Sequence, residues 1–306
     1  MGQSSVTESQ TFNGPTIASA IQSDTLLISR RPLLWLNVIC LDAPLVAVGW
    51  QWIFAQTFSV TPAASNRVAL FLTAWFIYLI DRFADSVSLN ANSPKSIRQQ
   101  TCREHRNLWL ALILIVGILD AVVIFSRVDF ATMVRGLLLG TAAFCYLILN
   151  WAYHKAWHML PIKELIIGIL FTAGSVVVGL PLALVGRSLI AFASAAGIFA
   201  MLCWLNCISI AVWESRLDLL QAKHSIATRV LSVNYWACVW LVGIASASVV
   251  IFFLGAFDPA LAICLGVSAV LLFLLHFGQI PRDERTALAD LVLLTPLAFL
   301  LLKKLL

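Results

Sequence analysis

Long apolar stretches, separated by short polar segments, recur along the chain and constrain its fold more than any other feature. The chain is 61% hydrophobic and only 11% charged, whereas soluble domains carry roughly 25% charged and 45–50% apolar residues. A helix needs about 20 mostly apolar residues to cross a bilayer. Nine stretches meet or approach this length: Leu33–Phe58, Arg67–Ile80, Leu108–Phe125, Phe130–Trp151, Glu164–Val185, Leu189–Trp213, Leu231–Leu254, Pro259–Phe277 and Leu288–Leu302. The sequence therefore predicts an all-α, polytopic membrane bundle and excludes a soluble enzyme, a disordered chain and a secreted disulfide scaffold.

The second stretch and the amino-terminal segment differ from the other parts of the chain. The second stretch is short, and we expect it to extend from about Ala63 to Asp85. Residues 1–29 are rich in Ser, Thr and Gln and lack the apolar core of a signal peptide. We expect a polar, disordered cytoplasmic tail over residues 1–29, followed by one nine-helix domain over residues 30–306.

Basic residues are distributed unequally between the two sets of loops. With the amino terminus on one side, 14 Lys and Arg residues fall in the loops of that side and five on the other. Cytoplasmic loops of membrane proteins carry such an excess. The charge bias predicts a multi-pass protein of the cell (inner) membrane with a cytoplasmic amino terminus. It also accounts for most of the net charge of +5 without a nucleic-acid partner.

Two acidic pairs stand at helix ends on the predicted cytoplasmic side. Asp81 and Asp85 end the second stretch, and Glu214 and Asp218 follow the sixth. A spacing of four residues puts both carboxylates of a pair on one helix face, with Cβ atoms about 5–6 Å apart. Mg²⁺ relieves the repulsion between such carboxylates and prefers their oxygens together with phosphate oxygens. The pairs therefore indicate a magnesium and diphosphate site, or else ordinary interfacial salt bridges with neighbouring arginines.

Both acidic segments resemble motifs of the UbiA superfamily of intramembrane prenyltransferases. Segment 77–85 matches the last two acids of the family pattern N-D-x-x-D-x-x-x-D, with Ile77 and Tyr78 at its first two positions. Segment 206–218 is similar to the second motif, in which Asn206 precedes the acidic pair and Glu replaces the first Asp. The resemblance covers roughly residues 30–300.

The region between the fourth and fifth stretches adds to this resemblance. Tyr146 and Tyr153 are followed by a segment similar to the family's L-K-x-x-x-x-G, with Ile162, Lys163 and Gly168 at the three named positions. In the family, basic residues of this region contact the diphosphate. The match extends to the order and spacing of the motifs and to the predicted number of helices.

The resemblance implies nine helices around a central cavity open to the cytoplasmic side, and a Mg²⁺-dependent transfer of an isoprenoid group. The substrates would be a prenyl diphosphate and an aromatic, lipid or other electron-rich acceptor. Membrane lipid would surround the site, and the isoprenoid chain would lie between apolar helices that open to it. The candidate residues are Lys163, Lys155, Tyr146 and Tyr153 for catalysis, Arg98, Arg103, Asn206 and Asp42 for substrate binding, and Asp81, Asp85, Glu214 and Asp218 for the metal. Alternatives are a different lipid-linked diphosphate, a non-catalytic subunit, or a transporter.

Four polar residues lie inside predicted spans. An intramembrane acid is a functional candidate by default, and Asp42, next to Pro44, is placed to line the central cavity. We interpret Asp120 as a structural residue near Arg127. We likewise expect Asp290 to pair with Arg285 or a neighbouring helix, and we interpret His276 as a packing or interface residue.

Overall fold

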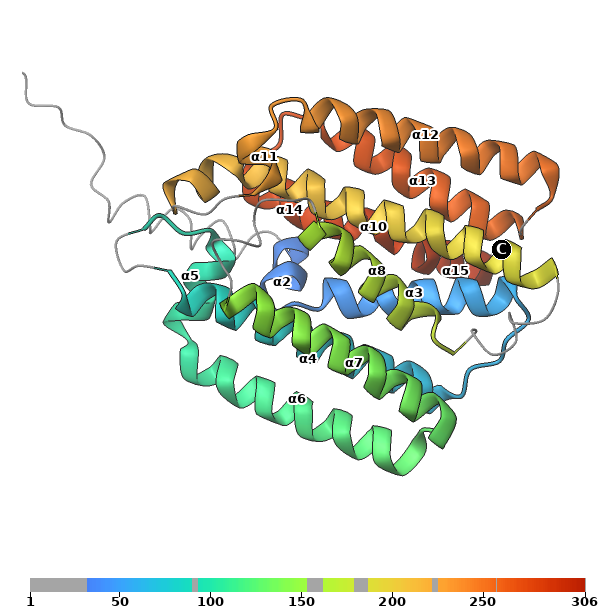
Figure 1. The fold of residues 1–306 in the computed structure, drawn as a ribbon, viewed down its shortest axis with the longest axis horizontal. Coiled ribbons are helices and arrows are strands. Elements are labelled where there is room, and N and C mark those ends of the chain that lie inside the picture. The colour runs from blue at the N-terminus through green and yellow to red at the C-terminus, as the bar shows by residue number, and fades with distance from the viewer. Residues whose placement is uncertain are drawn as a thin grey trace, which may run out of the picture.

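A computed structural model shows a bundle of helices that run mostly along its longest axis (Figure 1). The structure describes residues 32–89, 93–152, 162–178, 187–221, 225–256 and 258–305. Every regular element in these ranges is helical, and they contain no strand. The prediction of an all-α protein is therefore confirmed for the described part of the chain.

In the described ranges, eight longer helices build the bundle and six shorter elements connect or extend them. The longer ones are α3 (Asp42–Thr57), α4 (Ala64–Val87), α6 (Arg106–Arg127), α7 (Phe130–Ala152), α8 (Ile162–Val176), α10 (Arg187–Leu220), α12 (Val233–Leu254) and α13 (Pro259–Leu275). The shorter ones are α2 (Pro32–Val38), α5 (Ile97–Glu104), α11 (Ile226–Arg229), α14 (Arg282–Leu291), the 3₁₀ turn η2 (Val292–Leu294) and α15 (Thr295–Leu305). The second predicted stretch does extend as expected, since α4 begins one residue after Ala63 and passes Asp85.

The protein is a helical membrane protein by the length and apolarity of its helices. Within the described residues five segments are long and apolar enough to cross a bilayer: Arg106–Arg127, Phe130–Asn150, Leu189–Leu220, Val233–Leu254 and Arg282–Leu305. Helices α6 and α7 expose large apolar side chains such as Leu114, Phe125 and Leu138. Continuous apolar surface of this kind is typical of contact with lipid.

The first predicted span is broken, which corrects the expectation of one helix over Leu33–Phe58. Helix α2 ends at Val38 and α3 begins at Asp42, and Cys40 between them has a φ of 60°. Pro44 explains the position of the break. Its ring excludes the carbonyl of the residue four positions earlier, which is Cys40, and it has no N–H to donate to that carbonyl.

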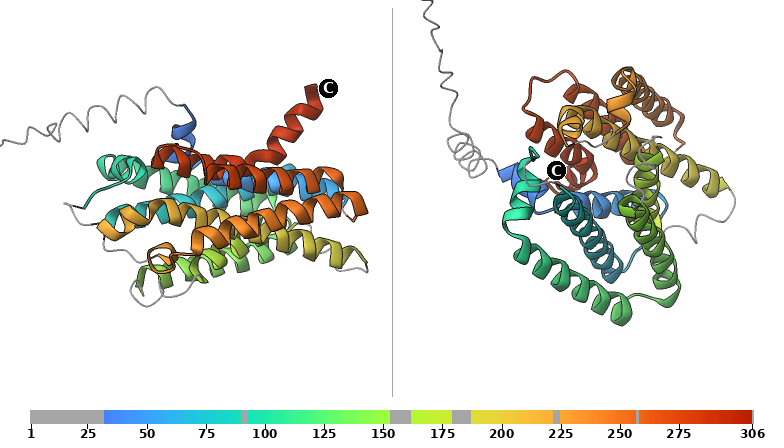
Figure 2. Two further views of the ribbon diagram at one scale, coloured as in Figure 1. Left: turned by 90° about the horizontal axis from the view of Figure 1, so that it is seen from above. Right: turned by 60° about the vertical axis from the view of Figure 1, so that its left-hand side comes forward.

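A second proline breaks the last predicted span, which begins at Arg282 and not at Leu288. The 3₁₀ turn η2 begins at Val292, four residues before Pro296, and α15 then leaves the bundle (Figure 2, left). The carbonyls around this turn find other donors: Ser268 Oγ donates to Val292 O at 3.0 Å, and Trp50 Nε1 to Leu293 O at 2.8 Å. In the core of a membrane no water is available to hydrogen-bond these carbonyls, so the two side chains supply the donors that they need.

The main core lies between α3, α10, α12 and α13. Trp50 and Phe199 are fully buried there and stack with ring centroids 4.1 Å apart. Helix α8 lies close against α10 because Gly168 has no side chain: an added Cβ would meet Ala200 O and Trp204 N at 2.9 Å. A smaller core between α4 and α6 is built around Leu79.

Two of the short helices, α5 and α11, lie at one end of the bundle, at the left of Figure 1. The acidic ends of α4 and α10 point to the same end. The fold therefore brings together segments that are more than a hundred residues apart in the sequence.

Candidate functional site

Helix α5 holds the two acidic helix ends together. The guanidinium of Arg98 forms an ion pair with the Glu214 carboxylate on α10, and Gln99 Nε2 donates to Asp85 Oδ2 on α4 at 3.2 Å. The side chains of Arg98 and Glu214 are only 9% and 14% exposed. Because Arg98 and Gln99 are consecutive, one acid from each predicted metal pair is held by the same short helix.

A capping box makes α5 a helix in spite of its polar sequence. The Gln99 backbone N–H donates to Ser96 Oγ at 3.4 Å, and the Ser96 N–H donates to Gln99 Oε1 at 3.0 Å. Gln221 Nε2, in the turn directly after α10, also donates to Gln99 Oε1 at 3.0 Å. Since both donors occupy the amide oxygen of Gln99, its amide nitrogen is turned toward Asp85.

A second buried guanidinium lies close to this end of the bundle. Arg82 donates a hydrogen bond to the hydroxyl of Tyr78, and its guanidinium carbon lies 4.7 Å from the centre of the Tyr78 ring. Tyr78 stands at the second position of the segment that resembles N-D-x-x-D-x-x-x-D. In this chain that position therefore carries a tyrosine that binds Arg82. Within the described residues, Nε of Arg82 and both Nε and Nη1 of Arg98 are buried without an acceptor. Such donors can bind an anion such as a phosphate.

A polar network lies inside the bundle, next to the break between α2 and α3. Asn37 Nδ2 donates to Asp42 Oδ2 at 2.6 Å and to Asp290 Oδ2 at 3.3 Å, and Asn206 Nδ2 donates to Asp290 Oδ1 at 2.9 Å. Asp42 and Asn206, both predicted as site residues, therefore meet in one network. Asp290 was expected to pair with Arg285 or a neighbouring helix, whereas Asn37 was not predicted to take part, although a polar residue within an apolar stretch was a usable signal.

Three intramembrane polar residues bond to neighbouring helices. Asp290 does so through Asn37 and Asn206, which is one of the two kinds of partner expected for it, while the Arg285 guanidinium donates to the carbonyls of loop 278–280. Asp120 accepts from Thr73 Oγ1 at 2.8 Å, in keeping with a structural role. His276 is hydrogen-bonded on both ring nitrogens, to Ser209 at 3.0 Å and Asn234 at 2.8 Å, so it lies at an interface between helices.

The remaining predicted residues are dispersed around this end. Lys163 lies in the first turn of α8, and Tyr146 on α7 is buried with its hydroxyl unpartnered among the described residues. Arg103 donates to Leu89 O at 3.1 Å and is exposed. It lies about 140° around α5 from Arg98, since each residue turns a helix by about 100°. Lys155 and Tyr153 lie outside the described residues.

The described residues do not by themselves assemble the expected magnesium site. The part of the chain that the structure describes contains no group of three or more His, Cys, Asp or Glu side chains able to hold a metal ion. Glu214 and Asp85 are instead engaged by Arg98 and Gln99. The acids in this arrangement do not fit a preformed magnesium centre.

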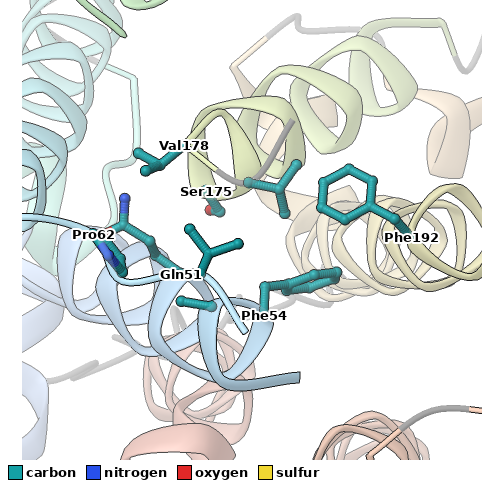
Figure 3. A pocket seen from close by; sticks show the side chains of 9 residues that line it. Gln51, Phe54, Pro62, Ser175, Val178 and Phe192 are labelled. Carbon is teal, nitrogen blue, oxygen red and sulfur yellow. The ribbon is translucent and has the colours of Figure 1, made fainter. Parts of the chain in front are cut away.

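An apolar pocket lies further along α3, toward the other end of the bundle. Phe54, Phe192 and Val178 line it, and Gln51 and Ser175 bring polar groups to it (Figure 3). Both polar atoms of the Gln51 amide are buried without a partner among the described residues. Gln51 lies nine residues after Asp42 on α3, so the two residues are about 13 Å apart along the helix axis.

Comparisons with known proteins return no relative. No family model matches the chain, and no curated protein or solved structure is significantly similar to it.

Proposed function

We propose that this chain is a membrane-embedded transferase of the UbiA type, which moves an isoprenoid group from a prenyl diphosphate to an electron-rich acceptor. The proposal includes nine spans and a cytoplasmic amino terminus, so that the end of the bundle bearing α5 faces the cytoplasm. One observation carries it. The adjacent α5 residues Arg98 and Gln99 hold acids from both motif helices, while Arg98 and Arg82 keep buried N–H groups without acceptors.

The unpaired guanidinium donors account for diphosphate binding. Arg98 contacts Glu214 through Nη2, which leaves Nε and Nη1 for a second anion. As the allylic carbon–oxygen bond breaks, negative charge develops on the departing diphosphate. Fixed cationic donors in a site of low water content stabilise that charge more than water does. The electron-rich carbon of the acceptor then attacks the allylic carbon and afterwards loses its proton.

Aromatic rings near this end can stabilise the positive charge of the allylic group. Tyr146 is buried close enough to Asp81 for that carboxylate to act on its hydroxyl electrostatically. The face of an aromatic ring attracts a cation within about 6 Å. Magnesium enters this proposal only as a companion of the diphosphate, because the described acids do not form a site for it on their own.

One observation favours a second function, that of a transporter. Two spans are broken, after α2 and after α14, and both breaks adjoin a buried acid. Discontinuous helices of this kind form substrate and ion sites in secondary transporters. The charged groups nevertheless gather at one end of the bundle, which favours a reaction with a substrate from the cytoplasmic side.

Purified protein in lipid nanodiscs tests the transferase proposal. Radiolabelled prenyl diphosphates of several chain lengths are offered with aromatic and lipid acceptors, with Mg²⁺ or with a chelator. Arg98→Gln should weaken diphosphate binding, whereas Arg106→Gln, an exposed arginine at the start of α6, serves as the matched control. Absence of both binding and product with every donor would refute the proposal, and uptake of a solute into proteoliposomes would favour the transporter.

A further inference from the structure

Two buried carboxylates share one amide donor inside the bundle. Asn37 Nδ2 lies 2.6 Å from Asp42 Oδ2 and 3.3 Å from Asp290 Oδ2. Asp42 is completely buried, and Asp290 is partly buried between α2 and α10. Two ionised carboxylates so close to one another repel strongly in a site of low dielectric constant.

This pair has no direct counter-ion. Within the described residues no Lys, Arg or His nitrogen lies within 4.0 Å of either carboxylate. Arg82 and Arg98 act on Asp290 only through space. Arg98 is already paired with Glu214, and Arg82 is bound to Tyr78 and lies near Asp81.

The titratable groups around the pair, within the described residues, leave the two carboxylates next to each other without a contacting cation. Asp42, Arg82 and Arg98 act on Asp290 through space. The other groups that act electrostatically with Asp42 or Asp290 are Cys40 from the break before α3, Tyr78 from α4, and Cys203 and Cys207 from α10. Two adjacent buried carboxylates are costly unless a cation or proton neutralises one of them.

The donors around the pair favour a proton over a metal ion. Asn37 places its N–H₂ group between the two carboxylates, where a metal ion would need an oxygen. The amide oxygen of Asn206 is buried without a hydrogen-bond donor in the described structure, although its amide nitrogen contacts Asp290. A half-turn of that amide puts its oxygen 2.9 Å from Asp290, at the distance of a hydrogen bond from a protonated carboxyl.

We propose that Asp42 and Asp290 form a proton-binding site that carries one proton at neutral pH, held on Asp290. Asp42 begins α3 and accepts hydrogen bonds from the Ala43 N–H at 2.9 Å and from Asn37 Nδ2 at 2.6 Å. The site lies next to both proline breaks. Loss of its proton would set two like charges against each other across Asn37 and loosen the contact between α2, α14 and α10.

The full-length protein in nanodiscs tests this inference without any substrate and independently of the transferase proposal. At neutral pH the infrared spectrum should contain the C=O band of a protonated carboxyl that disappears in Asp290→Asn. In the folded state the site binds one proton more than in the unfolded state. The unfolding equilibrium constant of the wild type should therefore rise about tenfold per pH unit until the proton is lost.

Asp290→Asn should remove this pH dependence and keep the hydrogen bonds of the network. Asp120→Asn is the matched control, because Asp120 is also a buried acid with one hydroxyl partner but lies outside the pair. A carboxyl band that is lost only in Asp120→Asn would overturn the inference. So would a wild-type stability that is constant from acidic to neutral pH, or that responds to added Na⁺ or Mg²⁺ in place of pH, and neither result requires Asp290→Asn to fold.

Discussion

Replacing Gly168 by alanine is expected to disturb the contact between α8 and α10. The added Cβ would lie 2.9 Å from both Ala200 O and Trp204 N, and 3.2 Å from Trp204 Cα. These are backbone atoms of a long helix, so they cannot rotate away as a side chain can. The two helices must move apart by a few tenths of an ångström or more, and the packing on both sides of the contact is lost.

The expected cost follows from two opposing terms. Overpacking a well-packed contact costs about 1–3 kcal/mol, while alanine in place of glycine within a helix gains about 0.5–1 kcal/mol. Gly174 lies on the same helix, and nothing lies within 4 Å of a Cβ added there. Gly174→Ala should therefore show only the gain, and the difference between the two variants isolates the packing term at about 1–3 kcal/mol.

Reversible unfolding in mixed micelles, followed by far-ultraviolet circular dichroism, measures both variants against the wild type. We expect Gly168→Ala to be less stable and Gly174→Ala to be equal or slightly more stable. Equal stability of the two variants would show that α8 and α10 are far enough apart at Gly168 to accommodate a methyl group. Gly168 is also the glycine of the segment that resembles the family's L-K-x-x-x-x-G, so the test gives that glycine a physical role.

Three further predictions concern the core, the acidic end and the orientation. Trp50→Ala removes a fully buried ring that stacks on Phe199, and should lower the free energy of unfolding by about 3–5 kcal/mol in the same assay. Asp85→Asn keeps an oxygen acceptor and should preserve the fold while lowering prenyl transfer about 10- to 100-fold; turnover at the wild-type rate would reject a role for this acid. Burial raises the pKa of the Cys102 thiol, so this residue should react slowly with maleimides, whereas Glu104→Cys on the exposed side of α5 should react rapidly from the cytoplasmic face alone. Labelling of Glu104→Cys from outside intact cells would reverse the proposed orientation.

Much of the helical framework was predictable because apolar stretches of spanning length favour one structure in a bilayer. The described parts of all nine predicted stretches are mostly helical, and the extension of the second stretch to Asp85 was expected. Five segments are long and apolar enough to cross a membrane, and the nine-span arrangement stays a prediction. The hydropathy pattern could not show the breaks, because it averages over many residues and Cys40 and Val292 are themselves apolar.

The candidate site was predictable only in part. A spacing of four residues placed Asp81 with Asp85 and Glu214 with Asp218 on helix faces, and loop charge placed both pairs at one end. Whether such acids bind a metal depends on what else reaches them. That is decided by α5, a polar segment whose helix depends on the Ser96 capping box and has no apolar periodicity to reveal it.

The two prolines connect the fold to the polar interior. Each interrupts a helix four residues before itself, and Asp42 follows one break by two residues while Asp290 precedes the other by two. A break inside a membrane releases backbone groups that need polar partners, so polar side chains are favoured at that depth. Here Asn37 donates to both Asp42 and Asp290, one beside each break, and the carbonyls of the 3₁₀ turn accept from Trp50 and Ser268. In a chain with so few charges, the prolines therefore decide where buried polar groups can gather, and the acidic motifs alone do not.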